Sequence, residues 1–320
     1  MGGMTDALIH LAVLAERDDD TYAAELDKVG ERYASTARDL LQGDNLVPVL
    51  DAWSQDAEDV RDVLKAIALV KSAPQRSRDV VAGYGEIWSA RLLAAYLGQE
   101  APERGGTWVD ARKVVTVHET ELGPTVLWDE SQKKFDSELP ADFSGIAVIT
   151  GFIATDQDGL PTTLGRNGSD FSAAIFAALS DASALSIWTD VDGVMSADPN
   201  RVPEAQVIDQ LTYNEAMELA YFGAKVIHPQ TLSPVIDKNI PLWIRNSHNP
   251  QHPGSRIAAD AERIDNIKGI TAIGGMALVN LEGSGMIGVP GTADRLFGAL
   301  KDAGVSVTLI SQASSEHSIC

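Results

Sequence analysis

Cysteine is almost absent from this chain of 320 residues, and its one cysteine, Cys320, is the last residue. A disulfide within the chain is therefore impossible, which fits a reducing compartment and leads us to expect a cytoplasmic protein. Long hydrophobic runs are also lacking. No apolar stretch approaches the roughly 20 residues of a membrane-spanning helix, and no secretory signal peptide is visible. We therefore expect no membrane partner.

Basic residues are scarce beside acidic ones, with 25 Lys and Arg against 46 Asp and Glu and a formal net charge of −21. A surface of this sign repels nucleic acid, so no such partner is expected. The six histidines do not cluster with cysteine; His248 and His252 are four apart, but Pro250 and Pro253 break any helix that would align them. The acidic run at 16–20 is typical of a solvated face. No metal site built from protein side chains is predicted.

Apolar periodicity predicts how most of the chain folds. Helical spacing covers residues 4–17, 21–42, 56–72, 85–97, 171–180 and 212–223. Runs rich in Val, Ile and aromatic residues predict strands at 113–119, 144–156, 184–190 and 240–246. Strands that alternate with helices favour an α/β fold, with a mostly parallel sheet covered by helices on both faces.

A stretch dense in Pro, Gly, Asn and His, residues 248–256, connects this region to a shorter module. The module is predicted to hold one or two strands within 269–283, a helix over 291–304 that stops at Gly304, and a strand over 305–311. This order indicates a small α+β unit that is unfinished at Cys320. We therefore predict one domain over 1–258 and a second, incomplete one over 268–320.

The stretch GRNGSD, residues 165–170, is a loop that enters the helix predicted at 171–180. Its glycines allow a tight backbone near a ligand, and Arg166 offers a planar guanidinium suited to a carboxylate or phosphate. Ser169 and Asp170 are good N-cap residues. Taken alone, the stretch fits a helix cap with a surface arginine equally well.

Three further stretches carry polar residues at positions typical of ligand sites. In WTDVDGVMSADP, Thr189 and Asp190 follow a buried strand, where ligands bind in open α/β sheets, although a polar turn explains them too. In FGAKVIHP, Lys225 lies near a helix end, where lysine is usually solvated. In GYGE, Glu86 is expected in the first turn of a helix, where the helix dipole favours a carboxylate.

Several common catalytic and nucleotide-binding motifs are missing. There is no G-x-x-x-x-G-K-[ST] phosphate loop, no G-x-G-x-x-G between a strand and a helix, and no G-x-S-x-G nucleophile elbow. The sequence therefore gives no support to a P-loop enzyme, a Rossmann dinucleotide site or an α/β-hydrolase.

In their order along the chain, MGGMTD, GYGE, GRNGSD, TDVDGV with the following ADP, and FGAKVIHP resemble the aspartate kinases of the amino-acid kinase superfamily. The resemblance covers nearly the whole chain and is nearest to the kinase half of bifunctional aspartokinase–homoserine dehydrogenases. The segments GMALVNLEGSGM and VSVTLISQASSEHSIC resemble the start of the family's ACT regulatory domains. Together, these resemblances imply the amino-acid kinase fold, a three-layer αβα architecture, followed by a partial ACT-like module.

The resemblance also implies a reaction and a substrate site. Aspartate kinases transfer the γ-phosphoryl group of ATP to the side-chain carboxylate of L-aspartate, the first step towards lysine, threonine and methionine. Arg166 would bind the α-carboxylate of aspartate and Glu86 its α-ammonium group. Asp170 would organise the reaction centre. The other residues expected at the substrate are Thr5, Gly168 and Ser169.

A nucleotide site and an effector site follow from the same resemblance. ATP would carry Mg²⁺ on its phosphates, and the residues expected beside the nucleotide are Thr189, Asp190, Met195, Arg201 and Lys225. The ACT-like tail implies an amino-acid effector, threonine or lysine, with Gln312 as the expected contact. ACT modules usually pair between subunits, so a homodimer is expected.

Some features depart from the family pattern. In the family, a strand with a Lys-Phe-Gly-Gly motif precedes MGGMTD, and its lysine contacts the phosphates; a chain truncated at both ends is therefore expected here. Met195 stands where an aromatic residue is common. Asn200 separates Arg201 from Asp-Pro, which an arginine often follows directly.

Two other functions stay open at this point. The lack of the phosphate-binding lysine fits a catalytically impaired protein that keeps amino-acid binding or a regulatory role. A sister kinase acting on glutamate, acetylglutamate or a nucleotide is the other alternative. GRNGSD and the ACT-like tail weigh against the sister kinase.

Overall fold

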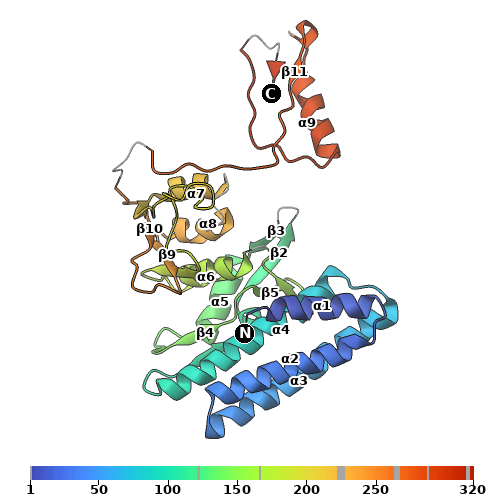
Figure 1. The fold of residues 1–320 in the computed structure, drawn as a ribbon, viewed down its shortest axis with the longest axis vertical. Coiled ribbons are helices and arrows are strands. Elements are labelled where there is room, and N and C mark those ends of the chain that lie inside the picture. Colours follow the sequence, from blue (N-terminus) through green and yellow to red (C-terminus); the bar gives the residue numbers. More distant parts are fainter. Residues whose placement is uncertain are drawn as a thin grey trace. The chain divides into compact units, whose positions relative to one another are not determined.

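The computed structural model describes residues 2–120, 123–165, 167–221, 228–262, 267–286, 288–314 and 318–320. The chain divides into two compact units, a larger one up to residue 271 and a smaller one over 272–320 (Figure 1). No helix in these described ranges is long and apolar enough to cross a membrane.

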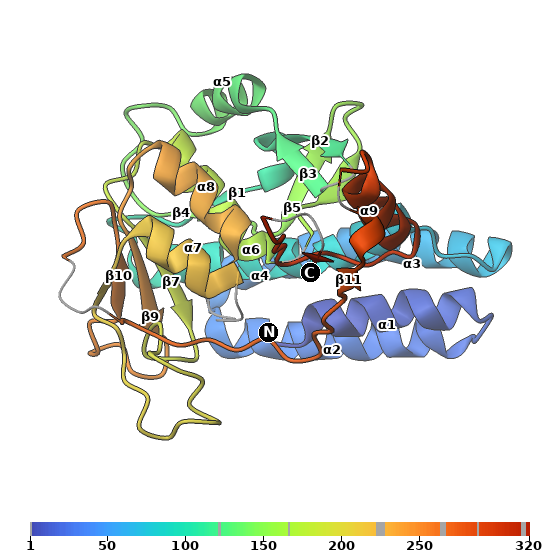
Figure 2. The same ribbon diagram turned by 90° about the horizontal axis from the view of Figure 1, so that it is seen from above.

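The larger unit begins with four helices that pack against one another (Figures 1 and 2). They are α1 (Met4–Glu16), α2 (Thr21–Leu40), α3 (Leu46–Val70) and α4 (Gln75–Glu100). Their core holds an aromatic cluster in which the rings of Tyr33, Trp53 and Trp88 lie 5.9–6.1 Å apart. The first two helices are as predicted. The third and fourth begin earlier than predicted, at residues 46 and 75.

The described strands of the larger unit form three sheets. The first pairs β1 (Thr107–Val109) with β4 (Ala147–Ile149). The second has the order β3 (Gly123–Val126), β2 (Thr116–Thr120), β5 (Ile153–Asp156), β6 (Pro161–Thr163). The third has the order β7 (Leu185–Thr189), β9 (Leu242–Asn246), β10 (Ser255–Ile257), β8 (Gln210–Leu211).

Most strand pairs in the described part of this unit are parallel, as predicted. The parallel pairs are β1–β4, β2–β5, β7–β9 and β8–β10. The antiparallel pairs are β2–β3, β5–β6 and β9–β10. Four helices accompany these sheets: α5 (Trp128–Glu138), α6 (Gly168–Leu179), α7 (Tyr213–Tyr221) and α8 (Pro229–Asp237). Helix α6 packs on α8 and on β7, and their apolar side chains share one core.

Two strand predictions need correction. The single strand predicted at 144–156 is two strands, because the backbone turns between β4 and β5 with Phe152 at a φ of 69°. The strand predicted at 113–119 begins at Thr116 instead, because residues 111–113 form a 3₁₀ helix. Asp110 caps that helix by accepting a hydrogen bond from the backbone N–H of Arg112.

The smaller unit has little regular structure apart from one helix. Helix α9 (Thr292–Asp302) is as predicted, and Gly304 follows it with a φ of 69°. The strands predicted within 269–283 and at 305–311 are mostly wrong. Only β11 (Leu281–Glu282) forms in the first, paired with β12 (Ser318–Ile319), and the described residues 305–311 form no strand. Apolar alternation gives a strand only where a neighbour satisfies its N–H and C=O groups.

Candidate functional site

One wall of the candidate site is made by α1 and α4. Thr5 lies in the first turn of α1. A Cβ placed on Gly85 of α4 would lie 3.6 Å from the backbone nitrogen of Thr5. Glu86 follows Gly85 and is half-buried. Burial raises the pKa of its carboxyl group. The helix-dipole explanation for Glu86 is wrong, because α4 begins at Gln75 and Glu86 lies in its middle.

A second part of the candidate site is made by the start of α6 and the turn after β4. A Cβ on Gly151 would lie 3.3 Å from the side chain of Ser169, and one on Gly168 would lie 2.7 Å from the ring of Phe152. Ser172 Oγ accepts a hydrogen bond of 2.8 Å from the Phe152 N–H. The turn and the helix therefore form one packed unit.

Asp170 lies in the first turn of α6, where bare backbone N–H groups favour negative charge. Its carboxyl group is half-buried, and burial raises its pKa. The interpretation of Ser169 and Asp170 as N-caps is wrong, because the helix begins at Gly168 and Asn167 is its N-cap. Arg166 lies outside the described residues.

These two parts of the site meet through β5. A Cβ on Gly83 of α4 would lie 2.9 Å from Ile153 Cγ2, at the start of β5. Glu86 lies three residues, about one turn, further along the same side of α4. Helix α4 therefore contacts the strand that directly follows the turn at 150–152, against which Ser169 packs.

A second group of polar residues lies at the carboxyl ends of the parallel strands β7 and β9. The carbonyl of Thr189 accepts hydrogen bonds from the backbone N–H and the hydroxyl of Ser247, at 2.8 and 2.9 Å. Thr189 Oγ1 lies 3.1 Å from Asp190 Oδ1. These two predicted residues therefore sit together at an edge of the third sheet.

Asp192 belongs to the stretch that the sequence singled out, but sequence reasoning missed Asn246 and Asn249, its two partners at this edge. Asp192 Oδ1 accepts hydrogen bonds from Asn246 Nδ2 at 2.8 Å and from Asn249 Nδ2 at 3.2 Å. The Asn246 hydrogen bond is the main reason why the pKa of Asp192 is lowered. The signal was available, since parallel strands place their carboxyl ends together and Asn246 ends the strand IPLWIRN.

After this edge the chain forms a hairpin over 194–208. Met195 pairs with Val207, and Ser196 N donates to Gln206 O at 2.7 Å. The tip of the hairpin is exposed and carries Arg201, whose Nε lies 3.9 Å from Asp198 Oδ2. Met195 and Arg201 therefore share one element. The last predicted nucleotide residue, Lys225, lies outside the described residues.

The charged side chains described at the site are mostly acidic, with Arg201 as the exception, while the predicted substrates are anionic. Glu86, Asp170, Asp190 and Asp192 all lie in the segments described above. Among the described residues no group of three or more His, Cys, Asp or Glu could hold a metal ion. A divalent cation carried on phosphates needs only one or two carboxylates. This donor set fits such a cation and does not fit a cage made by the protein alone.

In the smaller unit, Gln312 lines a cavity of about 310 Å³ at the start of α9. The other lining residues are Met286, Gly288, Val289, Pro290, Gly291, Thr292, Ala293 and Ile319. Gln312 also pairs with Ile319 through the backbone. The N–H groups at the start of α9 border this cavity, which suits it to a carboxylate.

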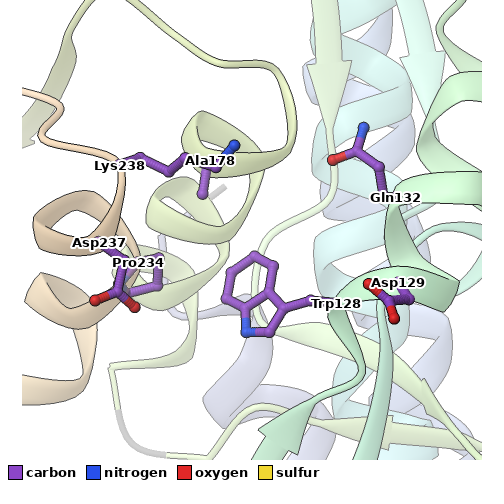
Figure 3. A pocket seen from close by; sticks show the side chains of 7 residues that line it. All are labelled: Trp128, Asp129, Gln132, Ala178, Pro234, Asp237 and Lys238. Carbon is purple, nitrogen blue, oxygen red and sulfur yellow. The ribbon is translucent and has the colours of Figure 1, made fainter.

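A hollow of about 310 Å³ between α5, α6 and α8 contains none of the predicted site residues (Figure 3). The indole of Trp128 points into it, towards Pro234 and Ala178. Ala178 is at the end of α6, whereas Asp170 is at its start. This hollow is therefore separate from the candidate site.

Comparisons with known proteins give one consistent result. A model described as the amino acid kinase family matches residues 2–246, and an ACT domain model matches residues 279–320. The chloroplastic bifunctional aspartokinase/homoserine dehydrogenase 2 of Arabidopsis thaliana is 44% identical over 329 residues, covering 100% of this chain and 36% of that protein. The bifunctional enzyme of Haemophilus influenzae is 44% identical over 73% of this chain and 29% of its own length. The chain thus spans about a third of these relatives.

Solved structures agree with the sequence relatives. Aspartokinase III of E. coli, in complex with aspartate and ADP, is similar over 100% of this chain and 69% of that chain, with a TM-score of 0.80 and 27% identity. The same protein in complex with lysine and aspartate gives a TM-score of 0.76.

Proposed function

Because the chain belongs to the amino acid kinase family, we propose that it is an aspartate kinase, which transfers the γ-phosphoryl group of ATP to the side-chain carboxylate of L-aspartate. The observation that carries this proposal is the similarity over the full chain to aspartokinase III in complex with aspartate and ADP. The product is 4-phospho-L-aspartate, an activated intermediate for amino-acid biosynthesis.

The chemistry asks little of the protein beyond positioning and charge. The nucleophile is a carboxylate, which is already ionised near neutral pH, so no general base is needed. One oxygen of that carboxylate bonds to the γ-phosphorus, the bond from this phosphorus to the β–γ bridging oxygen breaks, and ADP leaves. Alignment of the two reactants and stabilisation of the equatorial oxygens supply most of the catalysis.

Glu86 and Arg166 would hold the two ends of the substrate backbone. The half-buried carboxylate of Glu86 suits the α-ammonium group, since an ion pair is stronger away from bulk water. Arg166 would bind the α-carboxylate in a bidentate manner. Thr5, Gly168 and Ser169 would line the space between them, and Asp170 would organise the reacting groups.

The nucleotide would lie along the sheet edge and the hairpin. Thr189 and Asp190 at the end of β7, Met195 and Arg201 on the hairpin, and Lys225 are the residues proposed beside it. The carboxylates of Asp170 and Asp190 would hold Mg²⁺ carried on the phosphates, and the cation would neutralise phosphate charge.

The ACT domain supports regulation by an amino acid, lysine or threonine, with Gln312 as the proposed contact. Lysine is bound together with aspartate in the second E. coli structure. A homodimer formed through ACT modules and a cytoplasmic location stay predictions.

The test is ADP release from Mg·ATP by this chain, with and without L-aspartate, and with glutamate, N-acetylglutamate and UMP as alternative acceptors. We expect release that depends on aspartate alone. Release driven by another acceptor would indicate a sister kinase. Binding of aspartate and ATP without turnover would indicate the impaired, regulatory alternative.

A further inference from the structure

Lys268, near the end of the larger unit, has a side chain that is almost fully enclosed. Only 10% of the side chain is exposed. Its ammonium group donates to Glu215 Oε2 at 2.9 Å, to the carbonyl of Glu262 at 3.1 Å and to the carbonyl of Gln210 at 3.2 Å. All three donors of the ammonium group are therefore engaged.

Glu215 is itself fixed in place. It lies in the first turn of α7 and forms a capping box with Thr212, whose N–H donates to Glu215 Oε2 at 2.8 Å. Burial works against its charge, yet the hydrogen bonds from Thr212 and Lys268 keep the pKa of Glu215 below its usual value. Lys268 thus pairs with a carboxylate that is held in position by the start of α7.

The residues directly after Lys268 lie on the hairpin of the candidate site. The Ile270 N–H donates to the carbonyl of Ser196 at 2.8 Å. A Cβ on Gly269 would lie 3.3 Å from the same carbonyl oxygen and 3.4 Å from both Ile208 and Leu219. The backbone at 268–270 is therefore packed against both the hairpin and α7.

The hairpin is held at its base, where Val194 is buried in the core and its N–H donates to Ser255 Oγ at 2.8 Å. Its two arms are joined at Met195 and Val207 and by backbone hydrogen bonds at Ser196 and Ile208. Beyond this short ladder the tip, with Arg201, is exposed. A fixed outer contact at Ser196 is therefore expected to limit how far the hairpin can swing.

We propose that Lys268 is a positioning residue for the nucleotide: by fixing residues 268–270 against the hairpin, it holds Met195 and Arg201 where they meet ATP. This inference rests on the proposed function, which assigns the hairpin to the nucleotide. Residues 268–270 lie outside every sequence stretch that was expected beside the nucleotide.

The test compares Lys268→Met, which keeps the chain length and removes the charge, with Lys268→Arg, which keeps the charge. Lys238→Met is the matched control, because it breaks an ion pair with Asp181 that lies away from the hairpin. Ile270→Pro is a second route, since it removes the N–H that Ser196 accepts while changing a residue that is 70% exposed. Each variant is measured for binding of Mg·ATP and of L-aspartate by calorimetry, and for hydrogen exchange at Ser196 and Ile208.

We expect Lys268→Met and Ile270→Pro to weaken ATP binding roughly tenfold, with faster exchange at both amides and unchanged aspartate binding. Lys268→Arg should restore most of the affinity, and Lys238→Met should match the wild type. Equal ATP affinity in the wild type, Lys268→Met and Ile270→Pro would overturn the inference alone. Failure of the wild type to bind ATP would contradict the proposed function and this inference with it.

Discussion

Glu86 and Asp170 are carboxyl groups for which the described residues show no charged partner, and the candidate site is built around them. Burial raises the pKa of both. A charged group held in this way is unfavourable for folding and favourable for binding a cationic ligand, because the ligand replaces the solvation that the group has lost. The site residues are thus expected to lower stability in exchange for affinity.

Replacing Glu86 with Gln or Asp170 with Asn should raise the melting temperature at about pH 7. A carboxyl group whose pKa is raised by folding stabilises the fold below its unfolded pKa, and this contribution is lost as the pH rises through the folded pKa. The gain from the neutral amide should therefore disappear at about pH 3.5. Thermal unfolding at the two pH values checks this. A lower melting temperature at neutral pH would indicate an ion pair, for example with Arg166.

Glu86→Gln should also weaken L-aspartate binding by about tenfold or more, because the α-ammonium group loses a charged acceptor. ATP affinity should not change. In the wild type, aspartate affinity should fall as the pH is lowered, and the fall should begin above the usual glutamate range, since the pKa of Glu86 is raised. Calorimetric titrations across that range measure both effects. Unchanged aspartate affinity in the variant would remove Glu86 from the site.

Single-residue signals in the sequence located only part of this arrangement. Thr189 and Asp190 were found because they follow a buried strand. Asn246 and Lys268 were not, since their partners lie 54 and 53 residues away along the chain. Hydrogen bonds over such separations leave no local pattern, and the one usable signal was the place of Asn246 at the end of a predicted strand.

At the scale of elements, periodicity predicted structure where packing is regular. Helices α1, α2 and α9 match their predicted ranges. The start of α4 was missed, because its first residues are Gln-Arg-Ser-Arg-Asp and give no apolar periodicity from which a helix could be predicted. The break at Phe152 could not be predicted, because a non-glycine residue at positive φ has no reliable sequence signal. Most of the strands expected in the smaller unit do not form, because its described residues offer few neighbouring strands to pair with.

The contact between α2 and α3 gives a stability prediction. A Cβ on the buried Gly30 would collide with the indole of Trp53, which is itself packed between Tyr33 and Trp88. Gly30→Ala should therefore cost about 1–3 kcal/mol of unfolding free energy, despite the better helix propensity of alanine. Gly98→Ala is the control, because its Cβ would meet only an ordinary contact of 3.7 Å. It should be neutral or stabilise by up to about 1 kcal/mol.

Denaturant unfolding of both glycine variants, followed by tryptophan fluorescence, measures the difference. A Gly30→Ala protein as stable as the wild type would mean that the aromatic cluster can shift at little cost. The element-scale account of the helical bundle would then be wrong.

At the scale of the whole molecule, the two units differ in how much they bury. The two large apolar clusters of the described residues lie entirely within the larger unit. In the smaller unit α9 has no buried residue, and Met276, Leu278 and Leu309 are 56–83% exposed. The smaller unit therefore has few interactions of its own to oppose opening.

Limited digestion with chymotrypsin should cut first within 272–320 and leave the larger unit intact. The exposed Leu and Met side chains there are good cleavage sites, and local opening exposes their backbone. Mass spectrometry of early time points identifies the cuts. The heat-unfolded chain is the control, and it should be cut throughout. First cuts inside α1–α4 would contradict this picture.

The anchored segment at 268–270 has a consequence for protein engineering. A chimera joined after residue 271 would keep Lys268, Gly269 and Ile270 on the hairpin, so the larger unit would retain these contacts whatever module followed. A junction placed before Lys268 would remove the contacts that Lys268 and Ile270 make, unless the fused sequence replaced them. If the hairpin binds the nucleotide as proposed, shifting a fusion point by a few residues should decide whether the hybrid binds ATP.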